Sequence, residues 1–154
     1  MRFVAAFVAL AALAAGPQTR PARSSDLPGV WLMADMTRNA PFDPEDKQFA
    51  PYQIFGFDKR GGMKHMTSAK PFTEGQLALF SSAPQITRYA VDKTGMLVLS
   101  SPSWDAPLKY HCRLVVKVED AAADPKSPQA GDLLLAAIDD RGREVWSKLL
   151  RKAP

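Results

Sequence analysis

The residues that could do chemistry are two histidines, one cysteine and a group of methionines. His65 lies in the run Met63-Lys64-His65-Met66, and thioether and imidazole ligands together suit Cu(I). On a strand Met63 and His65 would share a face, so a third ligand, such as Met33, would have to come from a neighbouring strand. The simpler interpretation is that these methionines pack the core. We therefore expect no resident cofactor or metal, and a Cu(I)-binding barrel stands only as an alternative.

The remaining residues give little indication of an enzyme active site. His111 adjoins Cys112, but neighbouring residues of a strand point to opposite faces, so the two cannot form a dyad. The chain contains no Gly-x-Ser-x-Gly elbow, no phosphate-binding glycine loop and no His-Glu-x-x-His zinc motif. Cys112, the single cysteine, is best explained as a small buried apolar residue. We expect a protein that is not an enzyme.

A repeated Asp-x-x-Gly pattern punctuates the chain at residues 58–61, 92–95 and 139–142. An aspartate that opens a turn can accept backbone N–H groups, and the glycine supplies the positive φ that closes it. Calcium would need further oxygen ligands, which these segments lack. The pattern predicts three hairpin turns.

The turns join segments rich in β-branched, aromatic and aliphatic residues. The expected strand pairs are residues 52–57 with 63–67, 86–91 with 96–100, and 133–138 with 144–150. Two further strands are expected over residues 27–37 and 110–119, and in the latter Val116 should face the same way as Cys112. Residues 73–76 resemble a capping box ahead of a short helical turn. Eight strands in a meander predict an all-β, antiparallel up-and-down barrel.

The N-terminal segment has the composition of an export signal. After Met1-Arg2, residues 3–15 form an unbroken apolar run that is shorter than the roughly 20 residues a membrane-spanning helix needs. Ala12-Leu13-Ala14 provides a small-x-small cleavage pattern, so we predict a signal peptide over residues 1–15 and a periplasmic or secreted protein. An uncleaved membrane anchor is the alternative. Residues 16–26, rich in Pro, Arg and Ser, are predicted to be a disordered spacer before a single domain over residues 27–154.

The charge distribution limits the possible partners. The 154 residues carry a net charge of +4, which falls to +2 without the first 26 residues because these hold three arginines and one aspartate. Lysines and arginines are scattered among acids rather than gathered in a stripe. We expect no nucleic-acid partner, and no membrane span once the signal peptide is removed.

Gly29-Val30-Trp31 resembles the Gly-x-Trp motif that opens the first strand of lipocalins and their bacterial lipocalin-like relatives. The loop over residues 39–51 also lies where that family has its large lid loop. The resemblance implies an eight-stranded barrel whose interior can hold one small apolar ligand. It also implies that a basic residue near the end of the last strand, Lys148 or Arg151, packs over Trp31.

Five aromatic residues are the candidate ligand-binding residues. Four are expected on strands and one in a proline-flanked loop at the barrel mouth: Trp31, Phe55, Phe57 and Tyr89, and Trp104. The alternative is that the first four fill a solid core. We expect a barrel that binds a small apolar or amphipathic ligand. A periplasmic protein-binding module, such as an inhibitor or envelope factor that uses Pro41-Phe42, Phe72 and Trp104, is the second hypothesis.

Overall fold

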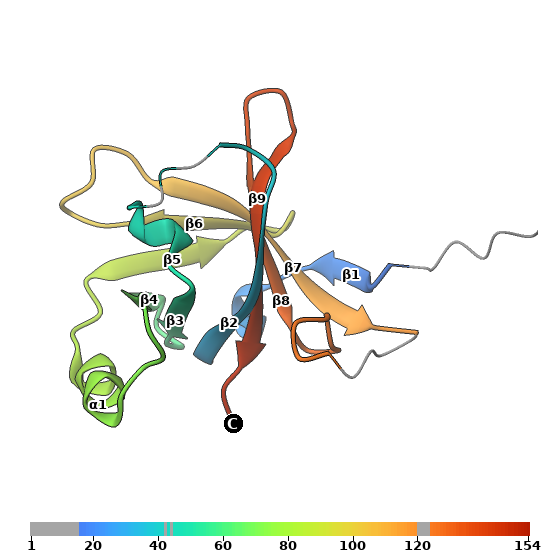
Figure 1. Ribbon diagram of the computed structural model, residues 1–154. Helices are drawn as coiled ribbons and strands as arrows, with labels where there is room; N and C mark the ends of the chain where they lie inside the picture. The colour runs from blue at the N-terminus through green and yellow to red at the C-terminus, as the bar shows by residue number, and fades with distance from the viewer. Residues whose placement is uncertain (1–15, 42, 44, 120–123) are drawn as a thin grey trace, which may run out of the picture.

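The chain folds into a closed barrel of eight antiparallel strands (Figure 1). The computed structural model describes residues 16–41, 43, 45–119 and 124–154, so the predicted signal peptide lies outside the described residues. Consecutive barrel strands pair with each other, and the last strand of the chain pairs with the first barrel strand through pairs such as Trp31↔Lys152, which closes the barrel. The predicted all-β up-and-down barrel is confirmed. Its strands are β2 (Gly29–Arg38), β3 (Tyr52–Phe57), β4 (Gly62–Ser68), β5 (Thr87–Val91), β6 (Met96–Ser100), β7 (Leu108–Lys117), β8 (Leu133–Ile138) and β9 (Glu144–Lys152).

One helix, α1 (Glu74–Ser82), lies in the connection between β4 and β5. The predicted capping box is present: Gln76 N donates to Thr73 Oγ1 at 3.2 Å, and Thr73 N donates to Gln76 Oε1 at 2.9 Å. A short 3-10 turn, η2 (Lys47–Phe49), interrupts the long loop between β2 and β3. Within the described part of the chain, no helix is long and apolar enough to cross a membrane.

The three Asp-x-x-Gly segments are hairpin turns, as predicted. In the second, Asp92 Oδ1 accepts Thr94 N at 2.8 Å and Met96 N at 3.0 Å, and Gly95 has a φ of 83°. The first and third turns repeat this arrangement around Asp58 and Asp139. In all three, hydrogen bonds that favour the ionised carboxylate lower the pKa of the aspartate. The carboxylates therefore serve as turn acceptors.

The predicted disordered spacer is wrong. Strand β1 (Gln18–Pro21) pairs with residues 113–117 of β7, beyond the part of β7 that pairs with β6, and a 3-10 turn, η1 (Ser24–Asp26), follows it. Arg20 holds Asp26 through two hydrogen bonds of 2.8 Å. Ala22 and Leu27 are buried, so this segment closes one end of the barrel. Two apolar side chains and unpaired edge groups on β7 order a stretch whose composition alone indicates disorder.

Strand β7 also departs from the expected alternation. Val115 is fully buried, whereas Val116, which was expected to face inward with Cys112, is 46% exposed. The cause is an irregularity opposite β1, where Thr19 pairs with Val115 but Gln18 pairs with Lys117. A bulge of this kind adds one residue and reverses the facing of those that follow. Cys112 is buried as expected, and burial raises the pKa of its thiol to about 12.

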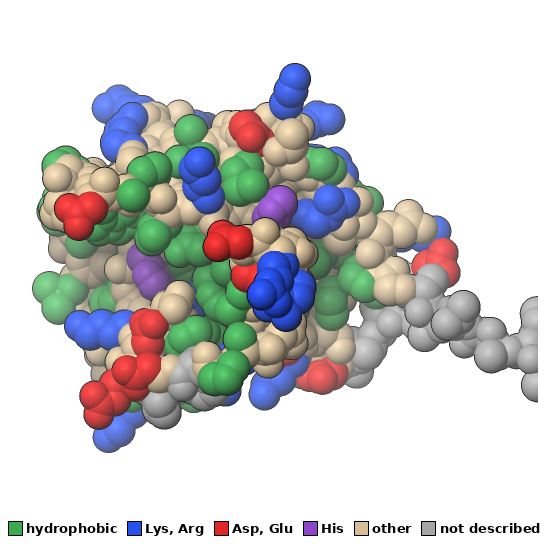
Figure 2. All heavy atoms as spheres, turned by 90° about the horizontal axis from the view of Figure 1, so that it is seen from above, with side chains coloured by type: hydrophobic (Ala, Val, Ile, Leu, Met, Phe, Trp, Pro, Cys, Tyr) green, Lys and Arg blue, Asp and Glu red, His purple; other side chains and the backbone are tan. Residues whose placement is uncertain are grey.

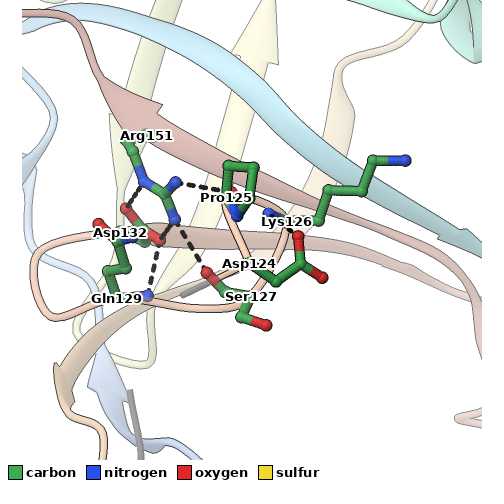
Figure 3. Close-up of polar contacts among 7 residues, drawn as sticks. All are labelled: Asp124, Pro125, Lys126, Ser127, Gln129, Asp132 and Arg151. Carbon is green, nitrogen blue, oxygen red and sulfur yellow. Dashed lines mark hydrogen bonds and ion pairs between the residues drawn. The ribbon is translucent and has the colours of Figure 1, made fainter. Parts of the chain in front are cut away.

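An ion pair fastens the loop between β7 and β8 to the last strand (Figure 3). Arg151 binds the buried Asp132 carboxylate through Nε at 3.1 Å and Nη2 at 2.7 Å. The same guanidinium donates to the carbonyl oxygens of Pro125 at 2.7 Å and Ser127 at 2.9 Å. Its hydrogen bonds to Asp132 raise the pKa of Arg151. One side chain of β9 therefore positions the described part of this loop.

The half of the barrel next to η1 is packed solid. Trp31, 2% exposed, donates from Nε1 to Leu27 O at 2.7 Å, and it belongs to the buried core cluster together with Ala22, Leu27, Tyr89, Cys112, Leu133 and Leu150. The basic residue over Trp31 is Lys152, whose Nζ lies 5.2 Å from the ring centre. The assignment of this position to Lys148 or Arg151 is wrong. Residues 146, 148, 150 and 152 face inward along β9, so Arg151 faces outward and Lys148 lies deeper in the barrel.

Candidate ligand-binding cavity

The other half of the barrel contains an open cavity of about 670 Å³. Its walls come from β3 to β9, whose strands alternate inward-facing and outward-facing side chains. Most of the lining is aromatic or aliphatic: Phe55, Phe57, Met63, Met66, Leu97, Leu99, Trp104, Leu108, Tyr110, Leu135 and Trp146. Asp46, Lys47 and Gln48, from η2 and the residue before it, also line the cavity. The size is within the range of about 300–1,000 Å³ typical of small-molecule sites.

Three of the five candidate residues line this cavity. Phe55 and Phe57 are buried on β3, and Trp104 lies in the loop between β6 and β7 with 39% of its surface exposed. The other two lie elsewhere. Trp31 belongs to the solid half, and Tyr89 lines a shallow hollow near η1, where its hydroxyl donates to Asp58 O at 2.7 Å.

The cavity end of the barrel has a mixed surface. Figure 2, which looks down on Figure 1, shows apolar side chains gathered between charged groups of both signs. Among the residues proposed for protein binding, Phe72 is half-buried and Phe42 lies outside the described residues. Trp104 contributes both to this surface and to the cavity lining.

A polar cluster interrupts the apolar wall, and Gln53 is its centre. Gln53 is 1% exposed, and its Nε2 donates to Gln48 O at 2.7 Å and Ala50 O at 3.0 Å. These two carbonyl groups fix the orientation of the amide, so Oε1 must serve as the acceptor. Lys148 Nζ donates to it at 2.9 Å, and His65 Nε2 lies 3.2 Å from it.

His65 is held as a neutral ring. It stacks on Phe55 with ring centres 4.2 Å apart, and its exposed side chain lines the cavity. The surrounding protein and then the positive charge of Lys148 lower its pKa to about 4. Because Gln53 Oε1 is an acceptor, Nε2 carries the proton of the neutral ring.

Lys148 is the charged group of the cavity. Its side chain is 3% exposed, and Nζ lies 4.6 Å from the Trp146 ring centre and 5.9 Å from that of Phe55. Burial lowers its pKa to about 8, and the charge of Asp46 partly opposes this shift. At neutral pH the lysine is therefore mostly protonated.

Of the three residues considered as Cu(I) ligands, the structure brings two together. Met63 and His65 both line the cavity, but Met33 packs against the core cluster and is not part of the lining. The described residues contain no group of three or more His, Cys, Asp or Glu side chains placed to hold a metal ion.

The sequence interpretation missed Gln53, Trp146 and the role of Lys148. A signal was present for the last two: in residues 144–150, alternation places Trp146, Lys148 and Leu150 on one face, and the apolar neighbours mark that face as buried. No comparable signal exists for Gln53, because its partners belong to the η2 segment and to two other strands.

The pairing between β4 and β5 is the shortest in the barrel. These strands pair only through Gly62↔Arg88 and Met63↔Thr87, whereas β3 and β4 form six pairs. A second hollow of about 360 Å³ lies against α1 and shares four lining residues with the cavity: Met63, His65, Met66 and Thr87.

Fold and site together define the class of this protein as a closed antiparallel β-barrel with an apolar cavity in one half. In comparisons with known proteins, no protein-family model, curated protein or solved structure matches the chain.

Proposed function

We propose that this protein is an exported, non-enzymatic barrel that binds a small apolar or amphipathic ligand in the cavity. The observation that carries the proposal is the division of the barrel into a solid half and a hollow half. An eight-stranded barrel can be filled by its own side chains, and here Leu27, Trp31 and Leu150 are fully buried in the half next to η1, whereas core residues of the other half line a cavity. A lined volume of this size that opens between loops is a typical ligand site.

A lipocalin-like relationship agrees with this function. Gly29-Val30-Trp31 opens the first barrel strand, and Lys152 from the last strand packs over the tryptophan. Export to the periplasm or the medium is supported by the apolar run at residues 3–15.

The proposal can be tested with N-phenyl-1-naphthylamine, an uncharged probe that fluoresces in apolar surroundings. We expect saturable binding at one site per chain. Leu99→Trp, which places an indole in the cavity, should abolish binding. Val98→Trp, on the same strand but facing the other way, should leave it unchanged.

Thermal unfolding of each variant establishes that the barrel is intact, and Thr87→Phe provides a second way to fill the cavity if Leu99→Trp does not fold. Absence of saturable binding to the folded wild-type protein would overturn the proposal. Equal binding by the folded cavity-filling variants would do the same.

A further inference from the structure

Lys148 is a buried cation that forms no ion pair with any acid among the described residues. The described residues form four ion pairs, and none of them involves Lys148. Asp46 lines the same cavity, but its carboxylate already accepts Gln48 N at 3.0 Å and Gln48 Nε2 at 2.8 Å. A buried charge is costly unless a counterion or several hydrogen bonds compensate for its lost hydration.

The hydrogen bonds of Lys148 leave capacity for a ligand. An ammonium group has three protons to donate, and the hydrogen bond formed by Nζ within the described residues goes to Gln53 Oε1. The other contacts of Nζ are the faces of Trp146 and Phe55, which attract a cation without accepting a conventional hydrogen bond. The side chain of Gln53 cannot rotate to accept a second proton from Lys148, because its amide nitrogen donates to two backbone carbonyl groups.

The remaining titratable groups that line the cavity are Asp46 and Lys47 near η2, His65 on β4 and Tyr110 on β7. The neutral ring of His65 does not compete with Lys148 for an anion, and burial raises the pKa of Tyr110, so its phenol also stays neutral. Among the charged residues that line the cavity, Lys148 is buried, whereas Asp46 and Lys47 are exposed.

We propose that Lys148 binds the carboxylate of an amphipathic ligand whose apolar tail lies against the aromatic and aliphatic wall of the cavity. This inference rests on the proposed function and specifies the ligand class: a small organic acid with a hydrocarbon or aromatic body. The carboxylate supplies the missing counterion and accepts the protons that Gln53 does not use.

The test compares two molecules with the same tail, decanoate and 1-decanol, as competitors of N-phenyl-1-naphthylamine at pH 6.5. We expect decanoate to displace the probe at a concentration about tenfold lower than decanol, the preference that a charge-assisted hydrogen bond of about 1.4 kcal/mol confers. Lys148→Met should remove this preference while probe binding persists. Lys152→Met, a lysine of the same strand at the closed end, should retain it, and Lys47→Met tests the other lysine of the cavity.

A second measurement needs no variant. Decanoate is ionised at both pH 6.5 and pH 9.5, whereas Lys148, with its pKa of about 8, loses its proton between these values. The preference for decanoate should therefore shrink at pH 9.5 while the affinity for decanol stays the same.

The outcomes separate the two proposals. Failure of the folded protein to bind the uncharged probe refutes the ligand-binding function itself. Probe binding with equal displacement by decanoate and decanol, or a preference that survives Lys148→Met or pH 9.5, refutes only the role of Lys148. A preference lost in Lys47→Met but kept in Lys148→Met assigns the anion to the mouth of the cavity and also refutes that role.

Discussion

Trp31 Nε1 donates a hydrogen bond to Leu27 O at 2.7 Å, and this bond ties the segment that closes the barrel to its first strand. The indole N–H would otherwise be a buried donor without a partner, which costs about 1–3 kcal/mol. The bond therefore orients Trp31 and holds Leu27 against the solid half of the core.

Leu27→Ala should lower the free energy of unfolding by about 2–5 kcal/mol, because Leu27 is fully buried and its removal leaves a void in a packed region. Urea denaturation measures the loss. Leu79→Ala on α1, where the side chain is 68% exposed, is the matched control and should change stability by less than about 0.5 kcal/mol. Equal effects of the two substitutions would show that the segment before β2 does not close the barrel.

Two glycines in equivalent turns should respond differently to alanine. Gly95 and Gly142 have φ values of 83° and 75°, so either substitution incurs the cost of a left-handed backbone, about 1 kcal/mol. A Cβ on Gly95 would lie 2.6 Å from Cys112 O and 3.0 Å from Pro21 Cβ, whereas a Cβ on Gly142 would meet nothing within 4 Å. Gly95→Ala should therefore destabilise the protein by a further 1–3 kcal/mol or so in urea denaturation. Similar losses at both sites would contradict the close packing of β1 against this turn.

Removal of the guanidinium of Arg151 should be costly. Arg151→Met leaves the carboxylate of Asp132, which is 3% exposed, without its cation, and we expect a loss of about 3 kcal/mol at pH 7. Lys117→Met removes the partner of Glu119 in an exposed pair and should cost less than about 1 kcal/mol. A small loss for Arg151→Met in the same assay would mean that solvent, rather than the ion pair, satisfies Asp132.

Stability should fall as the pH decreases from about 6.5 to 4 because of His65. The pKa of this ring is about 4 in the folded protein and near 6.5 in the unfolded chain, so over this interval the unfolded chain binds the additional proton. Protonation therefore favours unfolding, and below pH 4 the contribution no longer changes. His65→Leu should flatten this part of the profile of unfolding free energy against pH. An unchanged slope in the variant would assign the pH dependence to other groups.

Local patterns predicted most of the barrel because each strand carries its own signal. Turn chemistry at Asp58, Asp92 and Asp139 marks three hairpins, and a capping box marks the start of α1. Closure follows from the number of strands, since a long meander leaves two edges that can pair with each other.

The features that could not be predicted depend on contacts between distant segments. The segment from Gln18 to Asp26 is ordered by β7 and by the closed end of the core, neither of which its composition reveals. The exposure of Val116 depends on a bulge opposite that same segment. The polar cluster requires Gln53, His65 and Lys148 from three strands, together with two carbonyl groups of a loop.

The short pairing between β4 and β5 is the place where the barrel can most easily increase its diameter. Widening a closed barrel requires that hydrogen bonds between some pair of strands lengthen or break, and the cost grows with the number of bonds in that ladder. The β4–β5 ladder has two residue pairs, so separating these strands breaks the fewest hydrogen bonds. Longer ladders, such as the six pairs between β3 and β4, oppose separation more strongly. We therefore expect any widening of the barrel to be concentrated at the β4–β5 pairing, next to α1.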